Sequence, residues 1–165
     1  EAMGARVELP EHGGLPMTIR GGKLRDVEWI NETGSAQVKS CIMLAALCSG
    51  VEAKVVESPR SRDHTERMLA AQGAEVWVND QSVLLHPVPK LAPLDVTVPG
   101  DPSSAAFFAA LAALAPHGDL LLRHVCVNET RIGFLGDART ADASLVVEIA
   151  AGRVPLAETG NEDTS

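Results

Sequence analysis

Two polar clusters along the chain have the residue types needed to bind an anion. Residues 35–40 (SAQVKS) combine hydroxyls, an amide and the Lys39 cation at the predicted start of a helix, where unpaired N–H groups favour phosphate or carboxylate. Residues 58–67 (SPRSRDHTER) carry three arginines, and a guanidinium pairs with phosphate through two parallel hydrogen bonds. Each cluster also has a purely structural interpretation, in which Ser35 is a helix N-cap without a ligand and the arginines form a solvated face.

The acidic residues and the histidine of the second cluster fit the start of a helix. Asp63 and Glu66 have the spacing of a capping box, which predicts that a helix begins there and explains both carboxylates. His64 could act as a general base, but its place inside the capping box favours a surface residue of that helix.

Composition restricts the class of partner. The 165 residues include 22 acids and 14 bases, and the net charge of -8 disfavours nucleic-acid binding. No run approaches the roughly eighteen apolar residues of a membrane span. Cys41, Cys48 and Cys126 lie in apolar runs without the spacing of a metal site, which predicts buried thiols in a reducing cytoplasm. We therefore expect a cytoplasmic protein that binds small molecules and neither nucleic acid nor membrane.

The elements that must position the clusters recur along the chain. Residues 35–50 and 103–118 each open with a serine, continue as an apolar helical body and end at a glycine. Residues 3–7 (MGARV) are echoed by residues 72–76 (QGAEV). The starting positions differ by 68 (35 to 103) and by 69 (3 to 72), so one register explains both pairs. A repeated unit is therefore predicted.

The predicted unit runs strand, helix, strand, helix, strand, strand and is complete over residues 23–93. Its predicted strands cover residues 24–30, 53–57, 75–78 and 82–86, and its predicted helices cover residues 35–49 and 63–72. Residues 1–22 are predicted to be the tail of a preceding unit. Residues 94–156 are predicted to be a partial further unit with an aberrant end, and residues 157–165 a disordered tail.

The two long helices are apolar on every face over residues 41–48 and 105–115, and such a helix has to be buried all round. We therefore expect an α/β fold in which repeated βαβαββ units place helices inside and sheets outside. The polar first turn of the first helix, including Lys39, then has to open onto solvent or a ligand cavity. In the second helix, Asp101 and Pro102 are predicted as the N-cap and the first helical residue.

Four motifs occur in order along the sequence, namely residues 35–40 (SAQVKS), 61–66 (SRDHTE), 98–105 (VPGDPSSA) and 128–133 (NETRIG). Over roughly residues 1–135 this series resembles the EPSP synthases. The resemblance implies an enolpyruvyl-transferase fold of the inside-out α/β type. It also implies transfer of the enolpyruvyl group of phosphoenolpyruvate to the 5-hydroxyl of shikimate 3-phosphate, with release of phosphate and without a metal or organic cofactor.

The resemblance also implies which residues bind the substrates. Ser35, the backbone of Ala36, and Gln37 would hold shikimate 3-phosphate, and Gln37 would also contact phosphoenolpyruvate. Arg62 matches the cation that contacts the shikimate phosphate in members with the Arg-Asp-His-Thr-Glu motif. Weaker candidates are Ser58 and Ser61.

Other family residues have no counterpart in this sequence. They are the N-terminal catalytic lysine, the phosphoenolpyruvate-binding arginines and the charged residues of the C-terminal domain, so no catalytic residue is assigned. We expect a central part of an incomplete enzyme that spans the family's hinge near residues 98–101, with a complementary part as partner. The alternatives are a shikimate-3-phosphate-binding module without turnover and the related transferase that acts on UDP-N-acetylglucosamine. The Ser-Ala-Gln and Arg-Asp-His-Thr-Glu motifs argue against the last.

Overall fold

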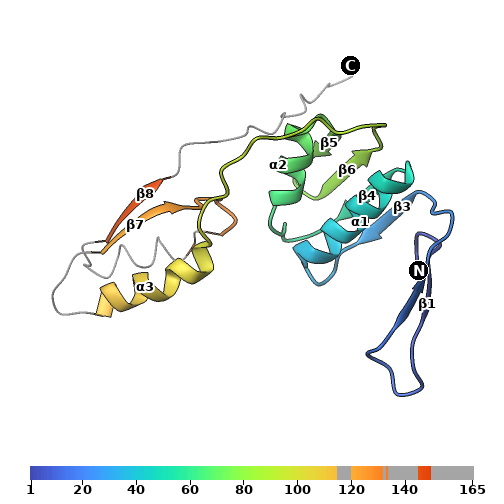
Figure 1. The fold of residues 1–165 in the computed structure, drawn as a ribbon, viewed down its shortest axis with the longest axis horizontal. Helices are drawn as coiled ribbons and strands as arrows, with labels where there is room; N and C mark the ends of the chain where they lie inside the picture. The colour runs from blue at the N-terminus through green and yellow to red at the C-terminus, as the bar shows by residue number, and fades with distance from the viewer. Residues whose placement is uncertain (115–119, 132, 134–144, 150–165) are drawn as a thin grey trace. The chain divides into compact units, whose positions relative to one another are not determined.

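The computed structural model describes residues 1–114, 120–131, 133 and 145–149 (Figure 1). The chain divides between Leu94 and Asp95 into two compact units. In the part of the chain that the structure describes, no helix is long and apolar enough to span a bilayer. The predicted tail over residues 157–165 lies outside the described residues.

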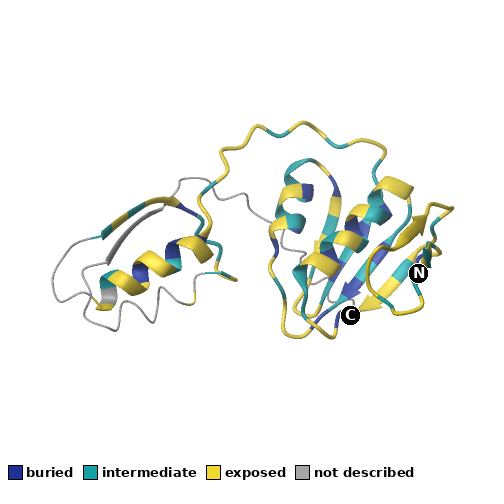
Figure 2. Cartoon of the chain, turned by 60° about the horizontal axis from the view of Figure 1, so that its bottom comes forward, coloured by how far each residue is buried: buried dark blue, intermediate teal, exposed yellow. Residues whose placement is uncertain are grey.

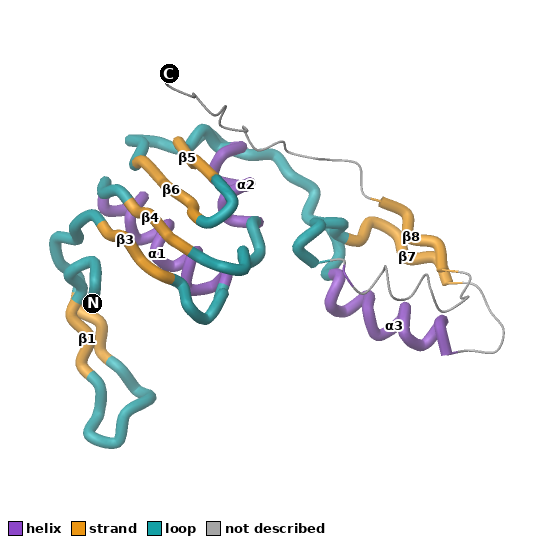
Figure 3. The backbone as a smooth tube through the Cα atoms, turned by 180° about the vertical axis from the view of Figure 1, so that it is seen from behind, coloured by secondary structure: helices purple, strands orange, loops and turns teal. Residues whose placement is uncertain are grey.

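The first unit is a four-stranded mixed sheet with two helices on one face (Figures 1 and 3). Its elements are β3 (Val27–Ile30), α1 (Ala36–Ser49), β4 (Ala53–Val56), α2 (His64–Ala71), β5 (Glu75–Val78) and β6 (Ser82–His86). The strand order is β3-β4-β6-β5; β3 and β4 are parallel, and β6 is antiparallel to both of its neighbours. The α/β class and this sequence of elements agree with the prediction, whereas their repetition along the chain stays a prediction.

Local signals explain where α1 begins and ends. Ser35 is the N-cap, with φ of -81° and ψ of 112°, and its hydroxyl accepts a hydrogen bond from the Val38 N–H. Gly50 ends the helix with φ of 67°, a left-handed conformation that glycine adopts without steric cost. A short hairpin, β1 (Arg6–Glu8) and β2 (Thr18–Arg20), precedes β3 within the same unit.

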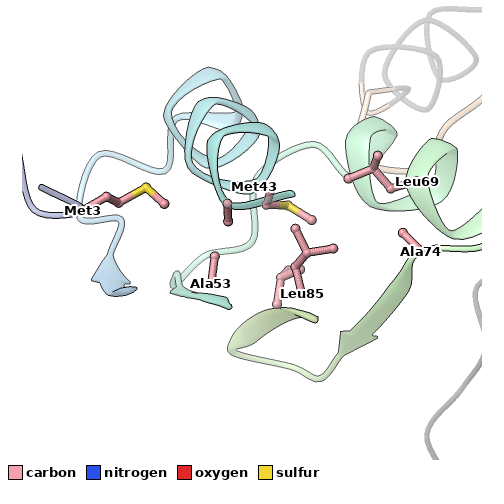
Figure 4. Packing of buried hydrophobic residues seen from close by; sticks show 8 residues of the cluster. Met3, Met43, Ala53, Leu69, Ala74 and Leu85 are labelled. Carbon is pink, nitrogen blue, oxygen red and sulfur yellow. The ribbon is translucent and has the colours of Figure 1, made fainter. Parts of the chain in front are cut away.

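The hydrophobic core lies between the two helices and the sheet (Figure 4). Met43 of α1 and Leu69 of α2 point toward Ala53 of β4 and Leu85 of β6. Met43, Ala53 and Leu85 are fully buried. These contacts fix α1 and α2 against the sheet.

The prediction that both long helices are buried all round is wrong for the described chain. Both helices carry exposed stretches (Figure 2). Leu44 of α1 is 45% exposed, and Phe107 of α3 (Pro102–Leu114) is 80% exposed. The prediction of buried cysteines also fails, because Cys41 and Cys48 are exposed and Cys126 is half-buried. The sheet covers one face of α1 only, so one stripe of that helix is buried and its other apolar positions are not.

The second unit contains α3 and a pair of parallel strands, β7 (Leu120–Val125) and β8 (Leu145–Ile149). The predicted start of α3 is confirmed. The Asp101 carboxylate accepts hydrogen bonds from the N–H groups of Ser103 and Ser104, and Pro102 is the first helical residue. These hydrogen bonds hold the pKa of Asp101 below its ordinary value.

Candidate functional site

The two polar clusters meet at one end of the sheet. Because β3 and β4 are parallel and Ile30 lies opposite Val56, the segments that follow both strands leave from the same edge. The Asn31 N–H donates to the Val56 carbonyl at 2.7 Å, and a Cβ placed on Gly34 would lie 4.0 Å from the Pro59 carbonyl oxygen. We call residues 31–37 the first arm and residues 57–62 the second arm.

The first arm turns from β3 into α1. Gly34 has φ of 58°, a conformation that side chains disfavour, and it brings Ser35 to the N-cap position. Ala36 is half-buried and Gln37 is exposed, so the first turn of α1 presents its N–H groups and an amide at the surface. The N-cap interpretation of Ser35 is therefore confirmed, and the hydroxyl retains its own hydrogen for a ligand.

The second arm runs from β4 toward α2. Its first residue, Glu57, is buried, Ser61 is half-buried, and Ser58 is exposed. Arg60 and Arg62 are both exposed. Arg62, the arginine predicted to bind the ligand, therefore lies on a segment that adjoins the first arm, where solvent can reach its guanidinium.

Lys39 is not at the surface, and the prediction that it faces solvent or a ligand cavity is wrong. Its side chain is 0% exposed, and Nζ lies 2.6 Å from Glu57 Oε1 and 2.5 Å from Glu66 Oε1. Lys39 shares a helical stripe with Met43 and Ala46, at spacings of four and seven residues, and this stripe faces the sheet. We call Lys39, Glu57 and Glu66 the buried ion cluster.

Glu57 connects the two arms, because its carboxylate accepts hydrogen bonds from residues of both. Oε1 accepts from Lys39 Nζ at 2.6 Å and from the Ser61 N–H at 3.0 Å. Oε2 accepts from Asn31 Nδ2 at 3.0 Å and from Ser61 Oγ at 2.8 Å. Asn31 Nδ2 also donates to the Ser35 carbonyl at 3.0 Å. Burial alone would raise the pKa of Glu57, but the hydrogen bonds from Lys39 and Ser61 outweigh it and lower the pKa.

Glu66 completes the cluster from α2. Burial raises its pKa, although the Lys39 ammonium acts in the opposite direction. Among the described residues, Glu66 Oε2 has no hydrogen-bond partner. Two carboxylates thus share one ammonium, and Glu66 is the one that holds a proton more readily.

The capping-box prediction is correct for the start of α2 and wrong for its side chains. The helix begins at His64 and Asp63 is its N-cap residue, but Asp63 makes no side-chain capping hydrogen bond. Its carboxylate accepts instead from Arg67 Nε at 2.8 Å, while Glu66 turns inward to Lys39. Cationic partners thus engage both carboxylates. His64 is exposed, as expected for a surface residue.

A second hydroxyl contact ties α1 to α2 beside the arms. Ser40 Oγ and Thr65 Oγ1 lie 2.6 Å apart, and the Ser40 hydroxyl donates to the Ala36 carbonyl at 2.7 Å.

In the second unit, Arg131 contacts Asp101 and Ser103, which brings together the last two of the four ordered motifs.

Sequence reasoning missed Asn31, Glu57 and the role of Lys39. A signal for Glu57 was present, because the buried alternation of Ala53 and Val55 in β4 continues to Glu57 just after the strand. Chemically, the exposed surface of the two arms offers a helix N-terminus, an amide and a guanidinium to an anion. The ionisable groups of the buried ion cluster are enclosed beneath that surface.

Comparisons with known proteins agree on one family. The family described as EPSP synthase (3-phosphoshikimate 1-carboxyvinyltransferase) matches residues 1–155. Over 137 residues the chain is 44% identical to the 3-phosphoshikimate 1-carboxyvinyltransferase of Persephonella marina, covering 81% of this chain and 32% of that protein. The corresponding Aquifex aeolicus protein is 47% identical over 137 residues, covering 80% and 32%. A solved EPSP synthase from Acinetobacter baumannii aligns with a TM-score of 0.69 and 40% identity, covering 81% of this chain and 31% of that one.

The chain thus spans about a third of the length of the curated relatives that it matches. The match nevertheless extends over most of its own length, including both arms and α3. This chain therefore belongs to the EPSP synthase family.

Proposed function

We propose that this chain supplies the shikimate-3-phosphate site of an enolpyruvyl transferase. In this proposal, the Ser35 hydroxyl, the Ala36 backbone, the Gln37 amide and the Arg62 guanidinium bind the ligand. The observation that carries the proposal is that both arms leave the sheet from the same end, with Arg62 and Gln37 exposed. Family membership supports the choice of substrate.

The chemistry assigned to the site is binding and orientation. The phosphate of shikimate 3-phosphate would accept two parallel hydrogen bonds from Arg62, and the positive end of α1 would add to them. Gln37 would reach toward phosphoenolpyruvate. In the transfer, the 5-hydroxyl oxygen bonds to the enolpyruvyl carbon, the hydroxyl proton leaves and phosphate departs. These steps require a proton donor and a base that we assign to no residue of this chain.

The organisation predicted from the sequence is part of the proposal. Residues 1–22 would end one unit, residues 23–93 would form a complete unit and residues 94–156 would begin another, with a hinge near residues 98–101. The similar helix-to-strand order of α1–β4 and α3–β7 supports the repetition. The unpaired thiols of Cys41, Cys48 and Cys126 support a reducing compartment such as the cytoplasm. A complementary part of the enzyme would supply the remaining residues.

A second candidate function is binding of shikimate 3-phosphate without turnover. The observation that favours it is coverage, since the chain matches about a third of its relatives' length. Phosphate release after phosphoenolpyruvate is added to the shikimate-3-phosphate complex separates the two candidates. The transferase predicts released phosphate, and the binding module predicts none.

Calorimetric titration tests the shared part of both candidates. We expect saturable binding of shikimate 3-phosphate and no binding of UDP-N-acetylglucosamine at the same concentration. Heat from the second ligand alone would overturn the assignment in favour of the related transferase, and heat from neither would refute the site.

A further inference from the structure

We propose that Lys39, Glu57 and Glu66 are positioning residues that hold the two arms in their anion-binding arrangement before the ligand arrives. This inference rests on the proposed function, because the arms are taken to bind shikimate 3-phosphate. It assigns a role to three buried side chains that do not reach the ligand-facing surface.

The geometry singles out Glu57 as the centre of this device. Its two oxygens accept four hydrogen bonds, from Lys39 Nζ, Asn31 Nδ2, and the N–H and hydroxyl of Ser61. Asn31, which donates to Glu57, also donates to the Ser35 carbonyl. Ser61, which donates to Glu57 as well, directly precedes Arg62. One carboxylate therefore links both arms.

Lys39 and Glu66 fix the position of that carboxylate. The Lys39 ammonium contacts Glu57 on one side and Glu66 on the other, so α1, the end of β4 and α2 converge on one buried point. The side chains of all three residues are at most 1% exposed. The contact therefore includes α1, which the first arm enters, and α2, toward which the second arm runs.

A contribution to stability does not by itself account for the burial of these three charged side chains. Removing three charged groups from water is costly, and apolar residues of similar volume often give equal or greater stability. Apolar side chains would pack α1 on the sheet, but they would not set the direction of the Asn31 amide or of the Ser61 N–H. Hydrogen bonds to a carboxylate do set those directions.

Ordered arms improve apparent affinity without any new ligand contact. When only a fraction of the molecules has the competent arrangement, the apparent Kd rises by the inverse of that fraction. Arms that spend about a tenth of the time in this arrangement would therefore bind about tenfold more weakly. This weakening is the measurable consequence of losing the link.

Glu57→Gln tests the link with little change of volume. Three of the four partners of Glu57 can only donate, namely Lys39 Nζ, Asn31 Nδ2 and the Ser61 N–H, so an amide nitrogen in place of either oxygen would face at least one such donor. In the ligand-free 165-residue chain, we expect faster hydrogen exchange at the amides of residues 33–37, 58 and 60–62. Affinity for shikimate 3-phosphate should fall about tenfold.

Leu85→Val is the matched control. Leu85 is fully buried in β6, so its truncation lowers stability without touching either arm. We expect this variant to keep wild-type affinity and to show no selective exchange at the arms. If Leu85→Val weakens binding as much as Glu57→Gln does, the effect is one of general stability and the proposal is wrong.

Ser61→Ala keeps the test decisive if Glu57→Gln fails to fold. Ser61 is half-buried, and its hydroxyl contributes one of the four hydrogen bonds. Exchange should then rise in the second arm and not in the first. Unchanged exchange in both arms would overturn the proposal. If the wild type does not bind shikimate 3-phosphate, the proposed function fails, and exchange at the arms still decides whether the buried ion cluster orders them.

Discussion

Replacing Arg62 with alanine removes the one guanidinium that the proposed site depends on. Arg62 is exposed at the end of the second arm, so truncating it disturbs no buried packing. A hydrogen bond to a charged group contributes about 1.5–3 kcal/mol, and solvent around this exposed side chain favours the middle of that range. A loss of about 2 kcal/mol corresponds to a roughly 30-fold rise in Kd for shikimate 3-phosphate.

The assay is isothermal titration calorimetry of wild type, Arg62→Ala, Arg67→Ala and Arg25→Ala at one salt concentration. Arg67 is engaged by Asp63, and Arg25 is an exposed arginine before β3, so both controls remove one positive charge outside the arms. We expect less than a threefold change in either control, because screened charges at a distance contribute little. Equal losses in all three variants would refute a specific contact by Arg62, and wild-type affinity in Arg62→Ala would refute the site assignment.

The isolated chain should release little or no phosphate from the two substrates in steady state, and turnover near that of a full-length relative would contradict this. Glu66→Gln should gain stability relative to wild type as the pH rises above 4.5, the ordinary pKa of the group. The reason is that a raised pKa stabilises folded wild type only while Glu66 is protonated, and this contribution is lost as the pH rises through the folded pKa. Urea unfolding at several pH values measures it, and a constant difference would contradict it. Met43→Ala should lose about 2–5 kcal/mol of unfolding free energy, because Met43 is fully buried in the core. The urea midpoint should fall with an unchanged slope, and a midpoint equal to that of wild type would show that the core is misassigned.

The elements of the first unit were predictable because their signals are local. A serine N-cap and a terminal glycine bound α1, and alternating apolar residues mark β4. The meeting of the two arms was also predictable, since parallel strands place their carboxyl ends at one edge of a sheet. The positions of Ser35 and Arg62 follow from these two facts alone.

The buried ion cluster was not predictable in the same way. Lys39, Glu57 and Glu66 are charged, and a charged residue considered by itself is expected at the surface. Burial becomes acceptable only when the three meet, and they come from three elements that tertiary packing brings together. Local spacing predicted that Glu66 belongs to a capping box, whereas in the structure its carboxylate pairs with the Lys39 ammonium.

The exposed faces of the two long helices show a different limit. An apolar sequence indicates that a helix can be buried, but it does not say which surface covers it. In the first unit the sheet covers only the stripe of Lys39, Met43 and Ala46. Leu44 of α1 is therefore exposed, and Phe107 of α3 in the second unit is exposed as well, although both helices have sequences typical of buried helices.

The most direct test of the central claim is an NMR titration of the isotopically labelled chain with shikimate 3-phosphate. The proposed site predicts saturable shifts at the amides of Ser35, Ala36, Gln37 and Arg62, with one common Kd, and unchanged amides in β5 and β6. Shifts confined to residues outside the two arms, or no shifts at millimolar ligand, would contradict it.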